Sequence, residues 1–390
     1  MNIRKITTFT FVLAVALVIV GFSACDQIQQ LLVPAPPQME GLSGELPVGV
    51  VLSITGRFAS TFGRSIGNGF ELALEDINNS QPGGRSIKFI IEDDQSTVEG
   101  AVEAYNKLIH QDGVPVILGP ATSSATEAVF PIAQENRVVA FSPTSAARGL
   151  SAIGDFVFRA ALTTDLLIPI GIETTSAKLG YKKAATMYDE NDVFSTDSDQ
   201  AVREAFAANG VEVLITETFQ GGNTDFSDQL TRIRDANPDI IFISSLSPEK
   251  PGILMQGRQV GIPYSVPFVM RTLTIADVHA AGEAAEGAIT FVGWASTADT
   301  PGNHAFVQNY SAKYGVEPDN YAARSYAALH ILAEAIANAQ STDSTAIRDA
   351  LANITDFDTV FGKFSFNAVG DAIYDPKILI VVNGQLEIFE

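Results

Sequence analysis

Val48 to Ile54 reads VGVVLSI, an apolar run rich in β-branched residues that is typical of a buried strand. Ile66, Phe70 and Leu74 then recur at helical spacing, which predicts an amphipathic helix. Pro82-Gly83-Gly84 follows and would stop that helix. A strand followed directly by a helix is the repeating unit of parallel sheets, so this stretch predicts an α/β fold.

The same alternation continues along most of the chain. One series of strands predicts a first sheet, at residues 87–91, 114–118 and 138–141, with helices at 97–110 and 124–136. A second series starts near Phe156 and predicts a second sheet, with helices at 164–179, 198–209 and 225–236 and strands at 184–188, 211–216 and 240–246. A strand at 287–292 and a long helix at 321–338 follow, and the sequence does not assign these late segments to a lobe. The last strands, at 363–366, 378–382 and 385–389, read as antiparallel, because Asn383-Gly384 is a strong hairpin signal.

The first residues have the layout of a secretory signal peptide. Arg4 and Lys5 precede the apolar run Phe11 to Val20, and Gly21 to Ala24 then lead to Cys25. That run is about half the ~20 residues that a membrane-spanning helix needs, so cleavage is the better interpretation. Phe22-Ser23-Ala24-Cys25 also resembles a bacterial lipobox, in which Cys25 becomes the diacylated first residue. The alternative is an ordinary signal peptide with a chance cysteine near the cut.

The region after Cys25 is predicted to be a lipidated tether over residues 25–45. It is rich in Gln, Pro and Gly and holds little that could build a core. Asp26 resembles the residue that keeps many lipoproteins of double-membraned bacteria on the inner membrane; otherwise it is a solvated carboxylate. We therefore expect the protein to be exported and anchored by lipid at the periplasmic or cell-surface face of a membrane, with the folded part beginning near Leu46.

Charge and composition exclude several function classes. The formal net charge is −21 over 390 residues, and it becomes −23 without the signal at 1–24, which holds two cations and no acid. Such acidity argues against nucleic acid and against electrostatic adhesion to anionic lipid. Cys25 is the sole cysteine, and the four histidines are scattered outside any metal-binding spacing, so we expect no metal and no cofactor. A folded part of about 345 residues predicts two lobes.

Catalytic motifs are scarce. The sequence has neither a Gly-x-Ser-x-Gly elbow nor a phosphate loop, and Gly63, Gly67 and Gly69 lie inside a helix at the wrong spacing for a dinucleotide site, so we interpret them as helix-packing positions. Glu92-Asp93-Asp94 ends a strand and could act on a substrate or a cation. Capping and solvation explain these three carboxylates more simply.

The most informative stretch is Gly119 to Glu127, which reads GPATSSATE. It leaves a buried strand, exposes hydroxyl groups and enters a helix. Backbone N–H groups and the helix dipole therefore converge on a point that suits a carboxylate, at the edge of a parallel sheet where ligands bind. A plain helix cap is the competing interpretation.

Several motifs occur in a characteristic order: Ser53-Ile54-Thr55-Gly56, residues 71–78, Asp93-Asp94, residues 119–124, Ser142-Pro143-Thr144-Ser145, Phe158-Arg159 and residues 367–371. Together they resemble the leucine/isoleucine/valine-binding protein family, the type I solute-binding proteins of ABC importers. The resemblance covers nearly all of residues 46–390. It implies two Rossmann-like lobes, joined by a three-crossing hinge, that hold a ligand between them.

The resemblance also implies lobe boundaries and ligand contacts. The first lobe would comprise residues 46–161 plus 295–357, and the second 162–294 plus 358–390. Ser123 would hold a ligand carboxylate and the Thr144 carbonyl an ammonium, with Ser124 and Ser145 beside them. The walls of the site would be Phe62, Phe194 and Leu246; each of these also suits ordinary core packing.

Two departures from the family pattern bear on the ligand. Ala146 replaces a hydroxyl residue, and no acid stands near residues 270–272 to pair an ammonium. Arg271 occupies that region and could clamp an anion, although it could also support the hinge. Asp165 or Glu190 could replace the missing acid. The ligand is therefore expected to be a hydrophobic, branched-chain-type amino acid or a related small carboxylate or amide.

Three functions remain open at the sequence level. The first is a receptor without enzymatic activity that delivers its ligand to an ABC permease in the membrane. The second is a sensory or regulatory binding protein of the same fold. The third is a hydrolase that uses Glu92, Asp93 and Asp94 or another carboxylate of the cleft.

Overall fold

The computed structural model describes residues 44–80 and 86–389. The predicted signal peptide, Cys25, most of the predicted tether and the predicted helix stop at 82–84 lie outside these residues. The described residues belong to one compact unit. None of their helices combines the length and the apolar character that crossing a bilayer requires.

The first sheet is parallel throughout, in the order β2-β1-β3-β4-β5. Its strands are β1 (Glu45–Leu52), β2 (Ser86–Asp93), β3 (Val116–Leu118), β4 (Val139–Ser142) and β5 (Val157–Arg159). The connecting helices are α2 (Arg64–Asn79), α3 (Val98–His110) and α4 (Ser123–Asn136), with the short turns η1 (Ala59–Gly63) and η2 (Ser151–Ile153). Strands β3 and β4 are buried along their whole length, which explains their unbroken apolar sequence.

The second sheet has the order β15-β14-β10-β9-β8-β6-β7, in which β14 and β15 are antiparallel. Its strands are β6 (Lys183–Asp189), β7 (Glu212–Phe219), β8 (Ile240–Ser244), β9 (Phe268–Arg271), β10 (Ile289–Val292), β14 (Lys377–Val382) and β15 (Gln385–Ile388). Its helical segments are α5 (Thr164–Leu179), α6 (Val193–Ala208), α7 (Ser227–Ala236), α8 (Glu249–Gln259), α9 (Ile275–Ala281) and η3 (Gly282–Ala285). The predicted hairpin is confirmed: Val382 pairs with Gln385, and both Asn383 and Gly384 have positive φ, as a two-residue turn requires.

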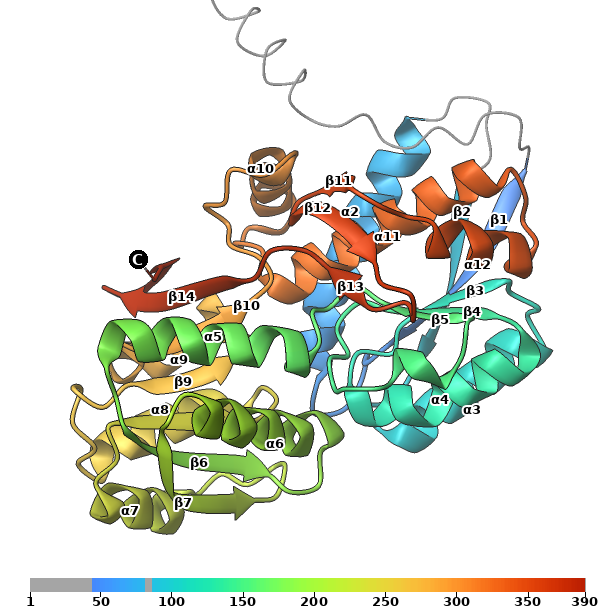
Figure 1. Ribbon diagram of the computed structural model, residues 1–390. Helices are drawn as coiled ribbons and strands as arrows, with labels where there is room; N and C mark the ends of the chain where they lie inside the picture. Colours follow the sequence, from blue (N-terminus) through green and yellow to red (C-terminus); the bar gives the residue numbers. More distant parts are fainter. Residues whose placement is uncertain (1–43, 81–85, 390) are drawn as a thin grey trace, which may run out of the picture. The chain divides into compact units, whose positions relative to one another are not determined.

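A later part of the chain returns to the first sheet. It contains α10 (Asn303–Tyr314), α11 (Asn320–Ala339), α12 (Ser344–Ala352) and a small sheet of β11 (Phe357–Thr359), β12 (Gly362–Phe366) and β13 (Ala372–Ile373). In Figure 1 the orange helix α11 lies against the blue helix α2, some 250 residues earlier in the chain. Gly69 permits this approach, since a Cβ there would stand 2.2 Å from Ser325 Oγ and 2.3 Å from the Ala322 carbonyl oxygen. This confirms Gly69 as a helix-packing position.

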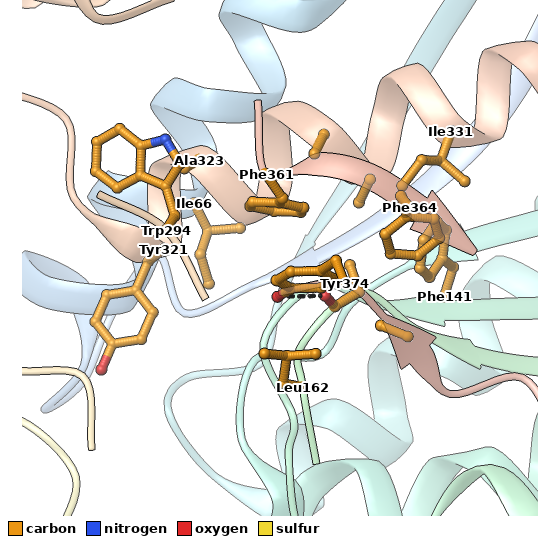
Figure 2. Packing of buried hydrophobic residues seen from close by; sticks show 14 of the residues in the cluster. Ile66, Phe141, Leu162, Trp294, Tyr321, Ala323, Ile331, Phe361, Phe364 and Tyr374 are labelled. Carbon is orange, nitrogen blue, oxygen red and sulfur yellow. Dashed lines mark hydrogen bonds between the residues drawn. The ribbon is translucent and has the colours of Figure 1, made fainter. Parts of the chain in front are cut away.

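Aromatic side chains fix the small sheet on the first sheet. Phe366 of β12 contacts Phe141 and Phe158, with ring centroids 5.6 and 5.1 Å apart. Phe361 stacks on Tyr374 at 4.5 Å with an interplanar angle of 13°, and both rings lie in the buried cluster that Figure 2 shows. These contacts build a continuous core from segments that are distant in sequence.

The described chain passes between the two sheets three times, after β5, after β10 and after β13. The lobe boundaries remain a prediction, but the contacts of β12 favour a different last boundary from residue 357. We propose that the third crossing lies at residues 374–376, because residues 357–373 pack on the first sheet and β14 joins the second.

Most predicted elements are present at nearly the predicted positions, and α5 has the predicted bounds. Helix α6 begins at Val193, five residues before the predicted start, because Asp192 caps it by accepting a hydrogen bond from the Ser195 backbone N–H. The elements that no sequence pattern predicted are β5, α8, β9, α9, α10, α12, β11 and β13. Strand β5 belongs to the first sheet, so the second series begins after Arg159 and not near Phe156. Helix α8 reads EKPGILMQGRQ, whose proline and glycines disfavour a helix locally.

Candidate ligand-binding cleft

A narrow cavity lies where the carboxyl ends of the strands of both parallel sheets meet, the position at which open α/β sheets bind ligands. Its free volume is small, about 30 Å³. The lining residues come from both sides of the crossings: Phe62, Ala121, Thr122, Ser123, Thr144, Ala146, Phe194, Ser245, Leu246, Lys250, Arg271, Thr272, Tyr321 and Arg324.

The start of α4 forms one wall, as the sequence predicts. Thr122 caps the helix by accepting a hydrogen bond from Ala125 N, and Ser123 is the first helical residue. Ser123 Oγ accepts hydrogen bonds from Ala146 N at 3.1 Å and from Ala147 N at 3.2 Å. Its own hydroxyl proton therefore remains available for an acceptor in the cleft, beside the first N–H groups of the helix.

Thr144 and Phe62 complete this side of the cleft. Thr144 Oγ1 donates to the Ala121 carbonyl at 2.6 Å, which fixes the loop after β4 against the loop after β3. The Phe62 ring meets Tyr321 edge to face, with centroids 4.7 Å apart, and is 3% exposed. Because Phe62 is so well packed, it acts as a preformed apolar wall.

Phe194, Leu246 and Arg271 line the opposite side. Arg271 ends β9, its Nη2 donates to the Leu162 carbonyl at 2.8 Å, and its guanidinium carbon is 5.3 Å from the centroid of the Phe194 ring. One cavity thus contains Arg271 and five residues that the family resemblance predicts around the site: Phe62, Ser123, Thr144, Phe194 and Leu246.

Lys250 and Arg324 also line the cavity, and the sequence analysis did not identify them. Lys250 is 1% exposed and its Nζ donates to the carbonyl oxygens of Arg271 and Thr272, at 3.0 and 2.8 Å. Arg324 is 2% exposed and follows Tyr321 by one turn of α11. An arginine on the apolar face of a helix was the one signal that could have revealed Arg324.

The cleft is strongly cationic. Among the described residues that line it, the ionisable side chains with formal charge are Lys250, Arg271 and Arg324, and no Asp or Glu is present. Burial, followed by repulsion from Arg324, lowers the pKa of Arg271 to about 9. Burial lowers the pKa of Lys250 to about 8, although Asp277 and Glu249 act in the opposite direction. The site therefore favours an anion.

Two predicted contacts do not reach the cavity. Ser124 Oγ donates to Asp192 Oδ1 at 3.0 Å and accepts from Val193 N at 3.1 Å, so it bridges the first sheet's α4 to the start of α6. Ser145 is buried away from the lining, and its backbone N–H donates to Ser142 Oγ. Consecutive side chains point in different directions, which is why neighbours of Ser123 and Thr144 do not share their role.

A second contact joins the same two sides. Arg57 Nη2 lies 2.7 Å from Glu249 Oε1, and that oxygen also accepts from Gly222 N at 2.8 Å. The Glu249 side chain is 2% exposed. With Ser124 and Asp192, this ion pair holds the cleft in its narrow arrangement.

The predicted carboxylate candidates serve structure. Asp93 accepts from the backbone N–H groups of Ile54, Thr55 and Gln95, at 2.8 to 3.1 Å, and Glu92 pairs with Lys107. None of Glu92, Asp93 and Asp94 lines the cavity. Asp165 and Glu190 are exposed and do not line it either. Within the described residues no group of His, Cys, Asp and Glu side chains is arranged to hold a metal ion.

Arg159 and Asp371 support the site from behind. Arg159 has no exposed side-chain surface, its Nε and Nη2 lie 3.0 and 2.5 Å from Asp371 Oδ1, and its Nη1 donates to the Ala147 carbonyl. Ala147 N in turn donates to Ser123 Oγ. Two segments of the family resemblance, at 158–159 and 367–371, thus meet and brace Ser123.

Fold and cavity together are those of a two-lobed binding protein of the type I class, with the cavity at the carboxyl ends of the parallel strands of two sheets. The family model for the periplasmic binding protein matches residues 45–379, so the chain belongs to that family.

Relatives support the same assignment. The Leu/Ile/Val-binding protein BraC3 of Rhizobium johnstonii is 24% identical over 339 residues, covering 84% of this chain and 89% of the relative. Among crystal structures, the leucine-binding protein LivK of Thermotoga maritima has a TM-score of 0.82 at 27% identity, covering 88% of this chain and 98% of the other. LivJ of Streptococcus pneumoniae, in complex with isoleucine, has a TM-score of 0.82 at 28% identity, with the same coverage. The predicted family and fold class are confirmed.

Proposed function

We propose that this protein is the solute-binding component of an ABC importer, which closes on a small ligand and presents it to a permease. The supporting observation is the buried cleft between the two sheets, which combines the Ser123 hydroxyl with Phe62, Phe194 and Arg271. Contacts such as Arg57–Glu249 join the two sides only when the cleft is narrow, so a ligand that favours closure would create the form that the permease recognises.

The proposed ligand is a small carboxylate with an apolar part. Ser123 and the start of α4 would hold the carboxylate, and Phe62, Phe194 and Leu246 would contact the apolar part. Isoleucine bound to LivJ makes a branched-chain-type amino acid one member of this group. An organic acid or amide is another, because no described carboxylate lines the cleft to pair an ammonium.

We further propose that acylated Cys25 anchors the protein to the membrane through the tether. A tether of about 20 residues reaches at most ~70 Å, which keeps the receptor near its permease. Metabolic labelling with a palmitate analogue would show incorporation into the wild type and none into Cys25→Ala. Labelling that persists in Cys25→Ala would contradict the proposed anchor.

The function is tested by a thermal-shift screen of amino acids, aliphatic and aromatic acids and amides, because a ligand that binds only the native state raises its Tm. With a confirmed ligand, Ser123→Ala is expected to lower the affinity about 10-fold, the effect of losing one charge-assisted hydrogen bond. Thr174→Ala is the control, since the Thr174 hydroxyl donates to the Ile170 carbonyl within α5 and does not line the cavity. Equal affinities of Ser123→Ala and wild type would refute the site.

The competing functions predict different results in transport and turnover assays with the confirmed ligand. Transport of the ligand that depends on a permease supports the importer, whereas binding without transport favours a sensor. Turnover of a ligand that disappears when Glu92, Asp93 and Asp94 are replaced would favour the hydrolase.

A further inference from the structure

The cations of the cleft lack the anions that usually accompany buried arginines. Within residues 44–80 and 86–389, Arg271 Nε and Nη1 and Arg324 Nε and Nη2 are buried without a hydrogen-bond partner. Both side chains are 2% exposed and both line the same cavity. Burying a guanidinium group costs free energy unless the group is paired. Two unpaired guanidinium groups beside one cavity therefore indicate a bound anion that accepts their hydrogen bonds.

The carboxylates whose charge acts on Lys250 and Arg271 are Asp277, Glu249 and Asp197. Each has another partner, and Asp197 pairs with Arg148 at 2.6 Å. Asp277 Oδ2 accepts from Thr274 N at 2.9 Å and from Thr274 Oγ1 at 2.8 Å, which caps α9. Glu249 pairs with Arg57. None of these carboxylates lines the cavity, so Lys250, Arg271 and Arg324 have no anionic partner among the described residues of the lining.

The hydrogen-bond donors of the cavity fall into two groups on different elements of the fold. One anionic position is provided by Ser123 and the start of α4, which belong to the loop after β3. Arg271 ends β9 of the other sheet and Arg324 belongs to α11, so their unpaired nitrogens offer a position on different elements of the same cavity. Arginine presents several donors in a rigid fork that suits a carboxylate.

We propose that the ligand is a short dicarboxylate, with one carboxylate at Ser123 and the other between Arg271 and Arg324. This assignment rests on the proposed function and narrows it from a small carboxylate to a dianion without an ammonium group. The three cations then meet two negative charges, and the unpaired guanidinium nitrogens gain acceptors. A zwitterionic amino acid would instead place its ammonium beside two arginines.

The first experiment is calorimetric titration of the full chain in detergent with malonate, succinate, glutarate and 2-isobutylmalonate. Each is compared with its monoamide, which has nearly the same size and one charge fewer, and the series includes leucine. We expect the preferred dicarboxylate to bind at least ~30-fold more tightly than its monoamide, because the amide leaves buried cations unpaired. Inorganic phosphate and sulfate separate a dicarboxylate site from a general site for dianions.

The second experiment uses Arg271→Gln and Arg324→Gln. Each is expected to reduce the preference for dicarboxylate over monoamide at least about 10-fold, with the folded state verified by its unfolding transition. Arg258→Gln is the matched control, because Arg258 also has buried unpaired nitrogens but lies between Tyr264 and Phe268, outside the cavity. It should leave the preference unchanged.

The outcomes are separable. A preference for dicarboxylates that both arginine variants reduce supports the proposal. Tighter binding of leucine, of the monoamides or of inorganic phosphate overturns it and leaves a small-molecule receptor in place. Absence of binding by every compound of both screens overturns it together with the proposed function.

Discussion

Replacing Asp371 tests whether the small sheet and the cleft are coupled as the structure indicates. Arg159 is fully buried and Asp371 is 16% exposed, so Asp371→Ala leaves a buried guanidinium with only Ser151 Oγ and the Ala147 carbonyl as partners. Removing one member of a buried ion pair costs about 3–5 kcal/mol. Since two neutral acceptors remain, we expect a loss near the lower limit, about 3 kcal/mol in the free energy of unfolding.

The assay is equilibrium unfolding in urea, with the midpoint and the slope fitted separately. Asp358→Ala is the matched control from the same small sheet: Asp358 pairs with Lys363, but the side chains are 39% and 62% exposed. That variant should lose less than about 1 kcal/mol. The double variant Arg159→Met, Asp371→Leu should recover most of the loss, because no buried charge remains unpaired.

The same substitution should also weaken ligand binding. Arg159 donates to the Ala147 carbonyl, and Ala147 N donates to Ser123 Oγ, so a displaced Arg159 loosens the serine that we propose as the carboxylate contact. Equal stability of Asp371→Ala and Asp358→Ala would refute the reasoning, since it would mean that the Arg159–Asp371 pair is not buried against the first sheet.

Three further predictions concern packing, pH and closure. Gly69→Ala should destabilise the protein by about 1–3 kcal/mol, because its Cβ would stand 2.3 Å from the Ala322 carbonyl oxygen. Burial lowers the pKa of His330 to about 4, so the unfolded chain takes up a proton as pH falls below about 6.5 while the folded chain does not. Stability should therefore fall between about pH 6.5 and 4, by up to about 3 kcal/mol, and His330→Phe should remove that contribution in urea titrations at each pH. Arg57→Met should lower ligand affinity about threefold to tenfold in calorimetry, because its pair with Glu249 joins the two sides of the cleft in the narrow arrangement.

Each of these has a control. Gly67→Ala should stabilise or be neutral, because the nearest atom to its Cβ, Leu52 Cδ1, is 3.6 Å away. His110 is exposed, and His110→Gln should leave the acid sensitivity unchanged. Lys88→Met removes an ion pair with Glu45 that is 63% exposed on both sides, and it should not alter affinity. A control that behaves like its partner variant would contradict the corresponding prediction.

Local patterns were sufficient for much of the fold. The apolar run at 48–54, the helix at 164–179 and the Asn383-Gly384 turn each depend on interactions within a few residues, and all three occur where the sequence predicts them. Helix α8 was missed because its proline and glycines lower its intrinsic propensity, while burial of Ile253 and Leu254 stabilises it in the folded protein. Propensity is a weak prior whenever tertiary packing opposes it.

The residues of the site also fall into those that the sequence predicts and those that only tertiary packing reveals. Ser123 and Thr144 could be predicted because each lies in the segment just after a strand, and the chain itself places such segments at the edge of a parallel sheet. Arg324 and Lys250 could not be assigned, because what matters about them is burial without a carboxylate beside them. That property arises only when α11, from a late part of the chain, packs on α2 and brings Arg324 to the cavity that Lys250 and Arg271 line. The sequence alone determined the family, the order of strands and helices, and one half of the cleft. Tertiary packing decided the charge of the cleft, because the balance of buried charges depends on which distant side chains become neighbours.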